Sequence, residues 1–212
     1  MSVAWRVLGE RQTHFAAAWE SDDPHYLARI THDLYSRADY ILGYHQKGAD
    51  NKWCLDDWGE AGLNRPRPWK DIDLYTLMGK FAYESRSLDH SAKRLEVKRK
   101  SGHYNAAEAE AAAAGDERAQ KRLAKYNKGD IAATIALWER LRGLVHVPGL
   151  NAGLHYGDDK LRCAYCGHDQ LDDAGAWAST GQTQYGMYEC RRCHNFTKNA
   201  SRKHSVSYRG VT

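Results

Sequence analysis

Four cysteines near the C-terminus have the residue type and the spacing of a metal site. They form two CxxC pairs, Cys163 with Cys166 and Cys190 with Cys193, and 23 residues lie between the pairs. Each pair sets two thiolates on one tight turn, and two facing turns complete a closed tetrahedral shell of four sulfur atoms. We therefore expect a zinc ribbon that holds one structural zinc ion and leaves no open position for a substrate. The alternatives are a pair of disulfides or unrelated core thiols, although no secretory segment argues for an oxidising compartment.

The sequence around the second cysteine pair and beyond it is basic. No acidic residue follows Glu189. One interpretation is a solvated tail, and the other is contact with nucleic-acid phosphates beside the ribbon. In the second case the nucleic-acid-binding residues would be Arg191, Arg192, Lys198, Arg202 and Lys203. A further cationic cluster, within residues 93–100, is interpreted as a solvated surface rather than a nucleic-acid channel.

Two carboxylates stand at positions that suggest chemistry. Asp130 belongs to an apolar helical stripe, so this acid faces a core and needs a metal ion or a cation, unless the helix is rotated and Asp130 is half-exposed. Asp50 follows a buried apolar run, and it either lies at the ligand-binding carboxyl end of a strand or only caps the next helix. The stripe consists of Leu123, Tyr126, Asp130, Thr134, Leu137 and Leu141.

The elements that must position these residues indicate an α/β fold. Alternating apolar residues on either side of Gly9 predict a hairpin from residues 2–8 and 12–18. The apolar run at residues 40–44 is typical of a buried parallel strand. Helices are expected over residues 24–37, 50–60, 72–83, from Ser87 onward, 106–114 and 117–144.

Length and composition bound the organisation of the chain. Its 212 residues, with a net charge of +4, suit one ordinary domain followed by a small metal-stabilised module. We place the α/β domain at residues 1–150, a linker at 151–160, and the zinc ribbon with its basic tail at 161–212. No membrane-span pattern or signal-peptide pattern is present, so we expect a soluble, cytoplasmic protein with no membrane partner. Packing roles are expected for Cys54, Trp19, Trp53, Trp58, Trp69 and Trp138, although an exposed tryptophan could stack on a single-stranded base.

Four stretches occur in a characteristic order and spacing. They are ADYILGYHQKGAD at residues 38–50, IDL at 72–74, SLD at 87–89 and YNKGDIAAT at 126–134. Together with the CxxC pairs they resemble the DEDD superfamily of 3′-5′ exonucleases, in particular the ribonuclease H-like exonucleases of bacteriophages, several of which carry a C-terminal zinc ribbon. The resemblance implies a ribonuclease H-like fold in the host cytoplasm. It also implies a nucleic-acid substrate, DNA rather than RNA, which two Mg²⁺ or Mn²⁺ ions help to hydrolyse.

The resemblance also assigns roles to single residues. Asp50 and Asp130 match metal ligands, and Tyr126, one helical turn before Asp130, matches the tyrosine that orients the attacking water. Asp73 and Asp89 match supporting positions, for which we expect a structural role. His45 stands where relatives usually carry asparagine.

One family motif is absent. Relatives begin with a central strand that carries Asp-x-Glu and supplies the first two of four carboxylates, whereas this chain contains no Asp-x-Glu. The sheet would then have a gap or an unpaired edge. Three explanations of this absence remain. Another polypeptide supplies the strand, the sequence is a truncated gene product, or the domain has lost catalysis and kept nucleic-acid binding. We therefore predict a 3′-5′ exonuclease that is incomplete alone, with a non-catalytic nucleic-acid-binding zinc-ribbon protein as the alternative.

Overall fold

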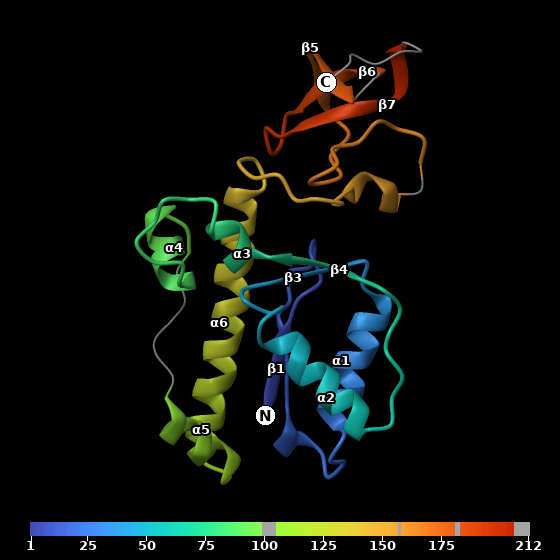
Figure 1. Cartoon of the computed structure of the whole chain (residues 1–212). Coiled ribbons are helices and arrows are strands. Elements are labelled where there is room, and N and C mark those ends of the chain that lie inside the picture. Colours follow the sequence, from blue (N-terminus) through green and yellow to red (C-terminus); the bar gives the residue numbers. More distant parts are fainter. Residues whose placement is uncertain (99–104, 157, 181–182, 206–212) are drawn as a thin grey trace, which may run out of the picture. The chain divides into compact units, whose positions relative to one another are not determined.

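A computed structural model describes residues 1–98, 105–156, 158–180 and 183–205 of the chain (Figure 1), with only the backbone described for residue 155 and residues 200–205. The chain divides into two compact units, Met1–Trp138 and Glu139–Thr212. Residues 151–160, expected as a linker, fall within the second unit and include a short 3₁₀ helix, η2 (Ala152–Tyr156).

The strands of the first unit form two separate two-stranded sheets. Strand β1 (Ser2–Trp5) pairs antiparallel with β2 (His14–Ala17), which confirms the expected hairpin. Strand β3 (Tyr40–Gly43) confirms the predicted apolar strand and pairs in parallel with β4 (Lys70–Asp73). The unit is therefore mixed α/β, as predicted.

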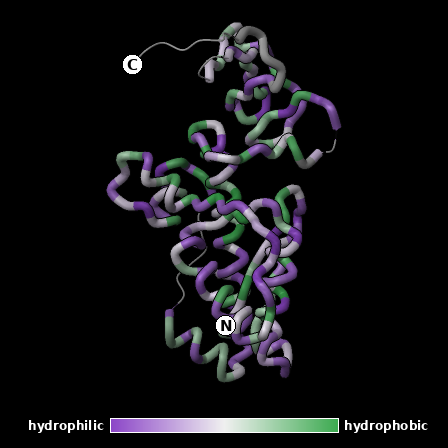
Figure 2. The backbone as a smooth tube through the Cα atoms, turned by 45° about the vertical axis from the view of Figure 1, so that its right-hand side comes forward, coloured by the Kyte–Doolittle hydropathy of each residue, from purple (hydrophilic) through white to green (hydrophobic). Residues whose placement is uncertain are grey.

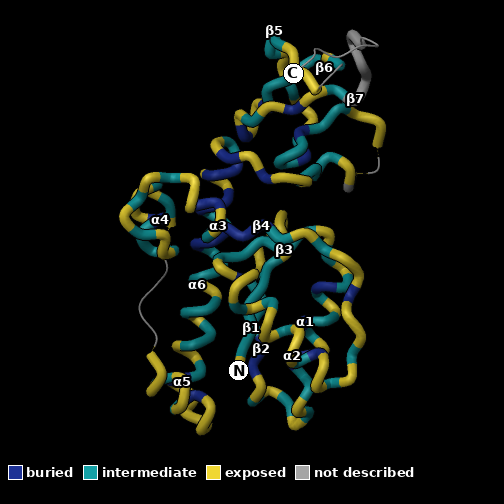
Figure 3. The backbone as a smooth tube through the Cα atoms, viewed as in Figure 1, coloured by how far each residue is buried: buried dark blue, intermediate teal, exposed yellow. Residues whose placement is uncertain are grey.

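Burial differs between the two strands of each sheet. Every residue of β1 and of β3 is half-buried, whereas β2 and β4 each contain two buried residues (Figure 3). Within the described residues, each strand has one edge without a hydrogen-bonded neighbour. The less buried strand of each sheet is thus β1 in the hairpin and β3 in the parallel pair.

Helices make up most of the rest of the first unit. One helix prediction is wrong. The predicted helix over residues 72–83 is replaced by the end of β4 and a short helix that stops at Met78. The reason is local, because the Asp73 carboxylate accepts a hydrogen bond from the Tyr75 N–H and caps the helix at Leu74. The helices are the 3₁₀ helix η1 (Ala18–Glu20), α1 (Tyr26–Arg37), α2 (Asp50–Glu60), α3 (Leu74–Met78), α4 (Leu88–Arg94), α5 (Ala106–Ala113) and α6 (Glu117–Leu141). Ser87 caps α4 as expected, since its hydroxyl accepts from the His90 N–H at 3.3 Å.

An aromatic cluster joins α1 to α2. Tyr35 and Trp58 are buried with ring centroids 5.1 Å apart, and the Trp58 indole donates to the Thr31 hydroxyl at 3.0 Å. Cys54 is half-buried against this cluster, which supports its predicted packing role. The packing prediction is wrong for Trp53, whose side chain is 64% exposed because the opposite face of α2 meets the cluster.

Helix α6 carries the predicted stripe, but its burial changes along the helix. Thr134, Leu137 and Leu141 are buried, whereas Tyr126 and Asp130 are only half-buried (Figure 3). Asp130 thus lies between the two alternatives: the residue is half-buried, as on a rotated helix, but its Oδ1 atom is buried, as for an acid that faces the core.

The second unit contains a three-stranded antiparallel sheet. Its strands are β5 (Leu171–Thr180), β6 (Thr183–Cys190) and β7 (Phe196–Ser205), in the order β5-β6-β7. Strand β6 runs directly into the second CxxC pair, since it ends at Cys190. Hydrophilic and hydrophobic stretches are mixed along the backbone (Figure 2). No described helix is long and apolar enough to cross a membrane.

Candidate functional site

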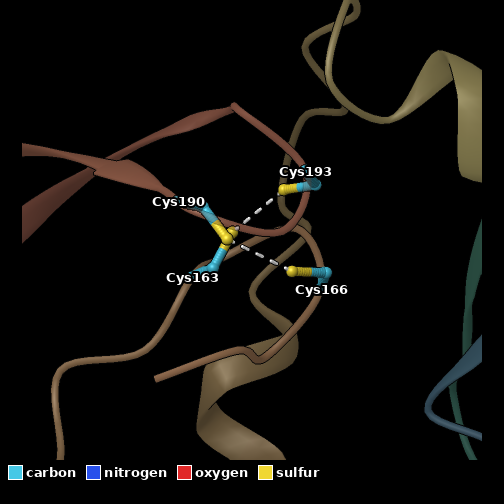
Figure 4. Close-up of side chains that lie close together, drawn as sticks. All are labelled: Cys163, Cys166, Cys190 and Cys193. Carbon is cyan, nitrogen blue, oxygen red and sulfur yellow. Dashed lines mark hydrogen bonds between the residues drawn. The ribbon is translucent and has the colours of Figure 1, made fainter. Parts of the chain in front are cut away.

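The four predicted zinc ligands converge on one point (Figure 4). The Cys163 Sγ lies 3.5 Å from the Cys193 Sγ, the Cys166 Sγ lies 3.6 Å from the Cys190 Sγ, and all four sulfurs lie within 4.8 Å of one another. A tetrahedral zinc with bonds of about 2.3 Å needs sulfurs about 3.8 Å apart. All four cysteines are free thiols rather than disulfides. The cluster is therefore positioned to hold a metal ion, consistent with structural zinc.

The two CxxC turns have the same backbone design. Gly167 donates its N–H to the Cys163 carbonyl, and His194 donates its N–H to the Cys190 carbonyl, both at 2.9 Å. Both donor residues have a left-handed backbone conformation, with φ of +72° for Gly167 and +56° for His194. Glycine adopts this conformation without strain, and histidine is among the residues that tolerate it best. Gly167 thus allows the tight turn of the first CxxC pair.

Hydrogen bonds among the thiols shift their pKa values in opposite directions. Hydrogen bonds from the Cys166 and Cys193 thiols hold the pKa of Cys163 well below its usual range. The same contacts raise the pKa of Cys193 and raise that of Cys166 to about 11. At neutral pH the site therefore holds protons that a metal ion must displace.

The predicted nucleic-acid-binding residues of the ribbon differ in their environment. The Arg191 guanidinium donates to the Asp172 carboxylate at 2.9 Å, and this contact holds the pKa of Asp172 below its usual value. Lys198 lies over the Tyr185 ring, with its Nζ 4.7 Å from the centroid. Arg192 is exposed and forms no ion pair with the described residues. Arg202 and Lys203 lie on β7, and their side chains are outside the described part of the chain.

Asp50 occupies the expected place beyond a parallel strand. It is the first residue of α2, reached from the carboxyl end of β3 through residues 44–49, and its N-cap neighbour is Ala49. Asp50 is exposed, yet nearby protein atoms exclude enough solvent to raise its pKa. His45 opposes this shift and Asp73 adds to it, so all three residues share one electrostatic environment.

Asp73 organises the loop before Asp50. Its buried carboxylate accepts backbone hydrogen bonds from His45 at 2.9 Å, Tyr75 at 3.0 Å and Lys47 at 3.3 Å. These contacts give Asp73 the structural role that was expected. His45 has a left-handed φ of +66°, a conformation in which asparagine is also common.

The other predicted catalytic residues lie on α6. Tyr126 and Asp130 are one turn apart and half-buried, while Asp89 lies in the first turn of α4. Among the described residues, only the four cysteines form a group of three or more His, Cys, Asp or Glu side chains with converging ligand atoms. A complete set of catalytic carboxylates is thus not assembled by this part of the chain.

Comparisons with protein-family models, with curated proteins and with solved structures found no match. The functional interpretation therefore depends on the residues themselves. Sequence reasoning missed one contact group near Asp50, formed by His45, Tyr75 and Arg86. The only sequence signal for it was the accumulation of aromatic and basic residues that follow the two parallel strands.

Proposed function

We propose that this protein is a zinc-ribbon nuclease subunit of the 3′-5′ exonuclease type, which hydrolyses phosphodiester bonds of DNA and needs additional carboxylates for full activity. The proposal depends most on one observation, the position of Asp50. An acid at the carboxyl end of a parallel strand, with a raised pKa, has the location and the electrostatics of a functional group.

The division of the strands supports the same interpretation. An antiparallel pair, β1 with β2, precedes a parallel pair, β3 with β4, and the least buried strand of each pair is β1 or β3. The family that the sequence resembles has one central strand between such pairs. A strand pairing with β1 and β3 would join the two sheets into one and cover both strands.

The carboxylates fit a hard divalent cation. Mg²⁺ is commonly held by one or two carboxylates, with waters and substrate phosphate as its remaining ligands. Asp50 and Asp130 would be these carboxylates, and Tyr126 would orient the attacking water. A bound Mg²⁺ or Mn²⁺ supplies Lewis-acid stabilisation of the charge that develops on the phosphate.

The additional carboxylates are assigned to a partner. The chain contains no Asp-x-Glu, so we propose that a second polypeptide contributes this motif on an extended strand. Two carboxylates in place of four predict weak metal binding and low activity for the chain alone.

The test is degradation of single-stranded DNA by zinc-loaded protein with Mg²⁺ or Mn²⁺. Strands labelled at the 3′ end and at the 5′ end give the polarity, and Asp130→Asn is the matched control. Metal-dependent loss from the 3′ end that disappears in Asp130→Asn supports the proposal. A folded, zinc-loaded protein with no cleavage, even at high Mn²⁺, contradicts activity of the chain alone.

The second candidate is a non-catalytic nucleic-acid-binding protein. Its specific support is that the cysteine cluster is the one converged ligand group among the described residues. Because such a closed zinc shell has only a structural role, binding would come from exposed cations such as Arg192 and Lys198. DNA binding without cleavage that decreases steeply with salt would favour this function.

A further inference from the structure

Three side chains meet beyond the carboxyl ends of β3 and β4. The His45 ring lies edge-on to the Tyr75 ring, with centroids 4.7 Å apart and an interplanar angle of 75°. The Arg86 Cζ lies over the same Tyr75 ring, 4.6 Å from its centroid. Tyr75 is half-buried, while His45 and Arg86 are exposed. Tyr75 therefore supports two planar groups that remain accessible from solvent.

Backbone contacts fix this group in place. One oxygen of the buried Asp73 carboxylate accepts from the N–H groups of both His45 and Tyr75. Gly48 leaves room for the imidazole, since a Cβ there would lie 2.8 Å from the His45 ring. The Tyr44 hydroxyl donates to the backbone carbonyl of Arg86. The two exposed groups are thus held by three separate segments of the fold.

The charge of Arg86 is not neutralised locally. No carboxylate of the described residues forms an ion pair with Arg86, so its planar fork of donors can still bind an anion. Lys47, in the same loop as His45, is exposed and also forms no ion pair with the described residues. Among the described residues, the ion-paired arginines are Arg29, Arg37, Arg67, Arg122, Arg142, Arg162 and Arg191.

We propose that His45, Tyr75 and Arg86 form a binding subsite for one unpaired nucleotide. The base stacks on the exposed imidazole or guanidinium plane, and the phosphate accepts hydrogen bonds from Arg86 and Lys47. Stacking on such planes tolerates any base, because every base has a π face. The subsite deepens the proposed function and rests on it, since Asp50 follows this same loop and would act on the bound strand.

The test measures binding of a fluorescent single-stranded oligonucleotide by anisotropy. The whole zinc-loaded protein is used in an Asp130→Asn background without added Mg²⁺, so that no cleavage occurs. Arg86→Gln and His45→Asn are the test variants, and asparagine tolerates the left-handed backbone at residue 45. Arg65→Gln is the matched control, because Arg65 lies over Trp69 with its Cζ 5.2 Å from the ring centroid, before the amino end of β4.

We expect Arg86→Gln and His45→Asn each to weaken binding by about 5-fold or more, from the lower end of the range for loss of one base stack upward. Arg65→Gln should leave binding unchanged. The wild-type protein should bind an oligonucleotide with abasic positions more weakly than the intact strand. On that abasic strand, Arg86→Gln should bind only slightly more weakly than the wild type. Equal effects of Arg86→Gln and Arg65→Gln, or equal loss on intact and abasic strands, would refute the subsite.

This experiment separates the two proposals because it measures no hydrolysis. Selective loss of binding in Arg86→Gln supports the subsite even where the wild type fails to cleave DNA. Cleavage and binding that both persist unchanged in Arg86→Gln and His45→Asn would overturn the subsite and leave the nuclease proposal standing.

Discussion

Asp73 provides a quantitative test of how the loop before Asp50 is held. One carboxylate oxygen accepts from His45 and Tyr75, and the other accepts from Lys47. Asp73→Asn can keep the first oxygen with both donors, but it turns an NH₂ group toward the Lys47 N–H. Asp73→Ala removes all three bonds. Loss of a helix cap costs about 1 kcal/mol, and a hydrogen bond to a charged group contributes about 1.5 kcal/mol or more.

We therefore expect Asp73→Ala to lower the free energy of unfolding by about 4 kcal/mol, the sum of one cap and two loop contacts. Asp73→Asn should cost only about 2 kcal/mol. Urea denaturation of zinc-loaded protein, followed by tryptophan fluorescence, measures both values. Asp56→Asn, at an exposed position, is the control and should change stability by less than about 0.5 kcal/mol. Equal costs for the asparagine and alanine variants would refute this account of the three contacts.

Three further predictions concern the metal, the acid and the aromatic core. Zinc affinity should rise with pH, because the Cys166 thiol, with a pKa of about 11, must lose its proton when zinc binds. Zinc release, measured with a chromogenic chelator, should therefore become faster as pH falls. A release rate that does not depend on pH would contradict this prediction. Because nearby protein atoms exclude solvent from Asp50 and raise its pKa, its ionised form destabilises the fold. Asp50→Asn should therefore raise the melting temperature at pH 7, and this gain should vanish as pH falls below the ordinary pKa of 3.8. Trp58→Ala should cost about 3–5 kcal/mol of unfolding free energy, whereas Trp53→Ala should cost less than about 0.5 kcal/mol, and similar losses would contradict the burial difference.

The features that could be predicted from sequence depend on local chemistry. The four cysteines were predictable because each CxxC pair fixes its own turn and four thiolates complete one shell. Strand β3 was predictable from a short apolar run, and α4 from the capping residue Ser87.

The features that were missed depend on contacts between distant residues. Strand β4 has the sequence Lys-Asp-Ile-Asp, which lacks an apolar strand pattern, and Asp73 is buried because backbone N–H groups of the loop at residues 45–47 satisfy it. The group of His45, Tyr75 and Arg86 likewise assembles from separate segments. Trp53 is a different case, since residues five apart lie about 140° apart around a helix, so Trp53 and Trp58 could not both face the core.

The most direct test of the central claim is whether Asp50 and Asp130 bind the same divalent cation. Mn²⁺ binding to the zinc-loaded protein can be followed by electron paramagnetic resonance in the wild type, in Asp50→Asn, in Asp130→Asn and in the double variant. A shared site predicts weak, saturable binding that either single variant reduces by about tenfold or more, with little further loss in the double variant. Mn²⁺ binding that neither substitution changes would contradict a common metal site and with it the proposed nuclease function. So would losses of Mn²⁺ affinity that simply add in the double variant.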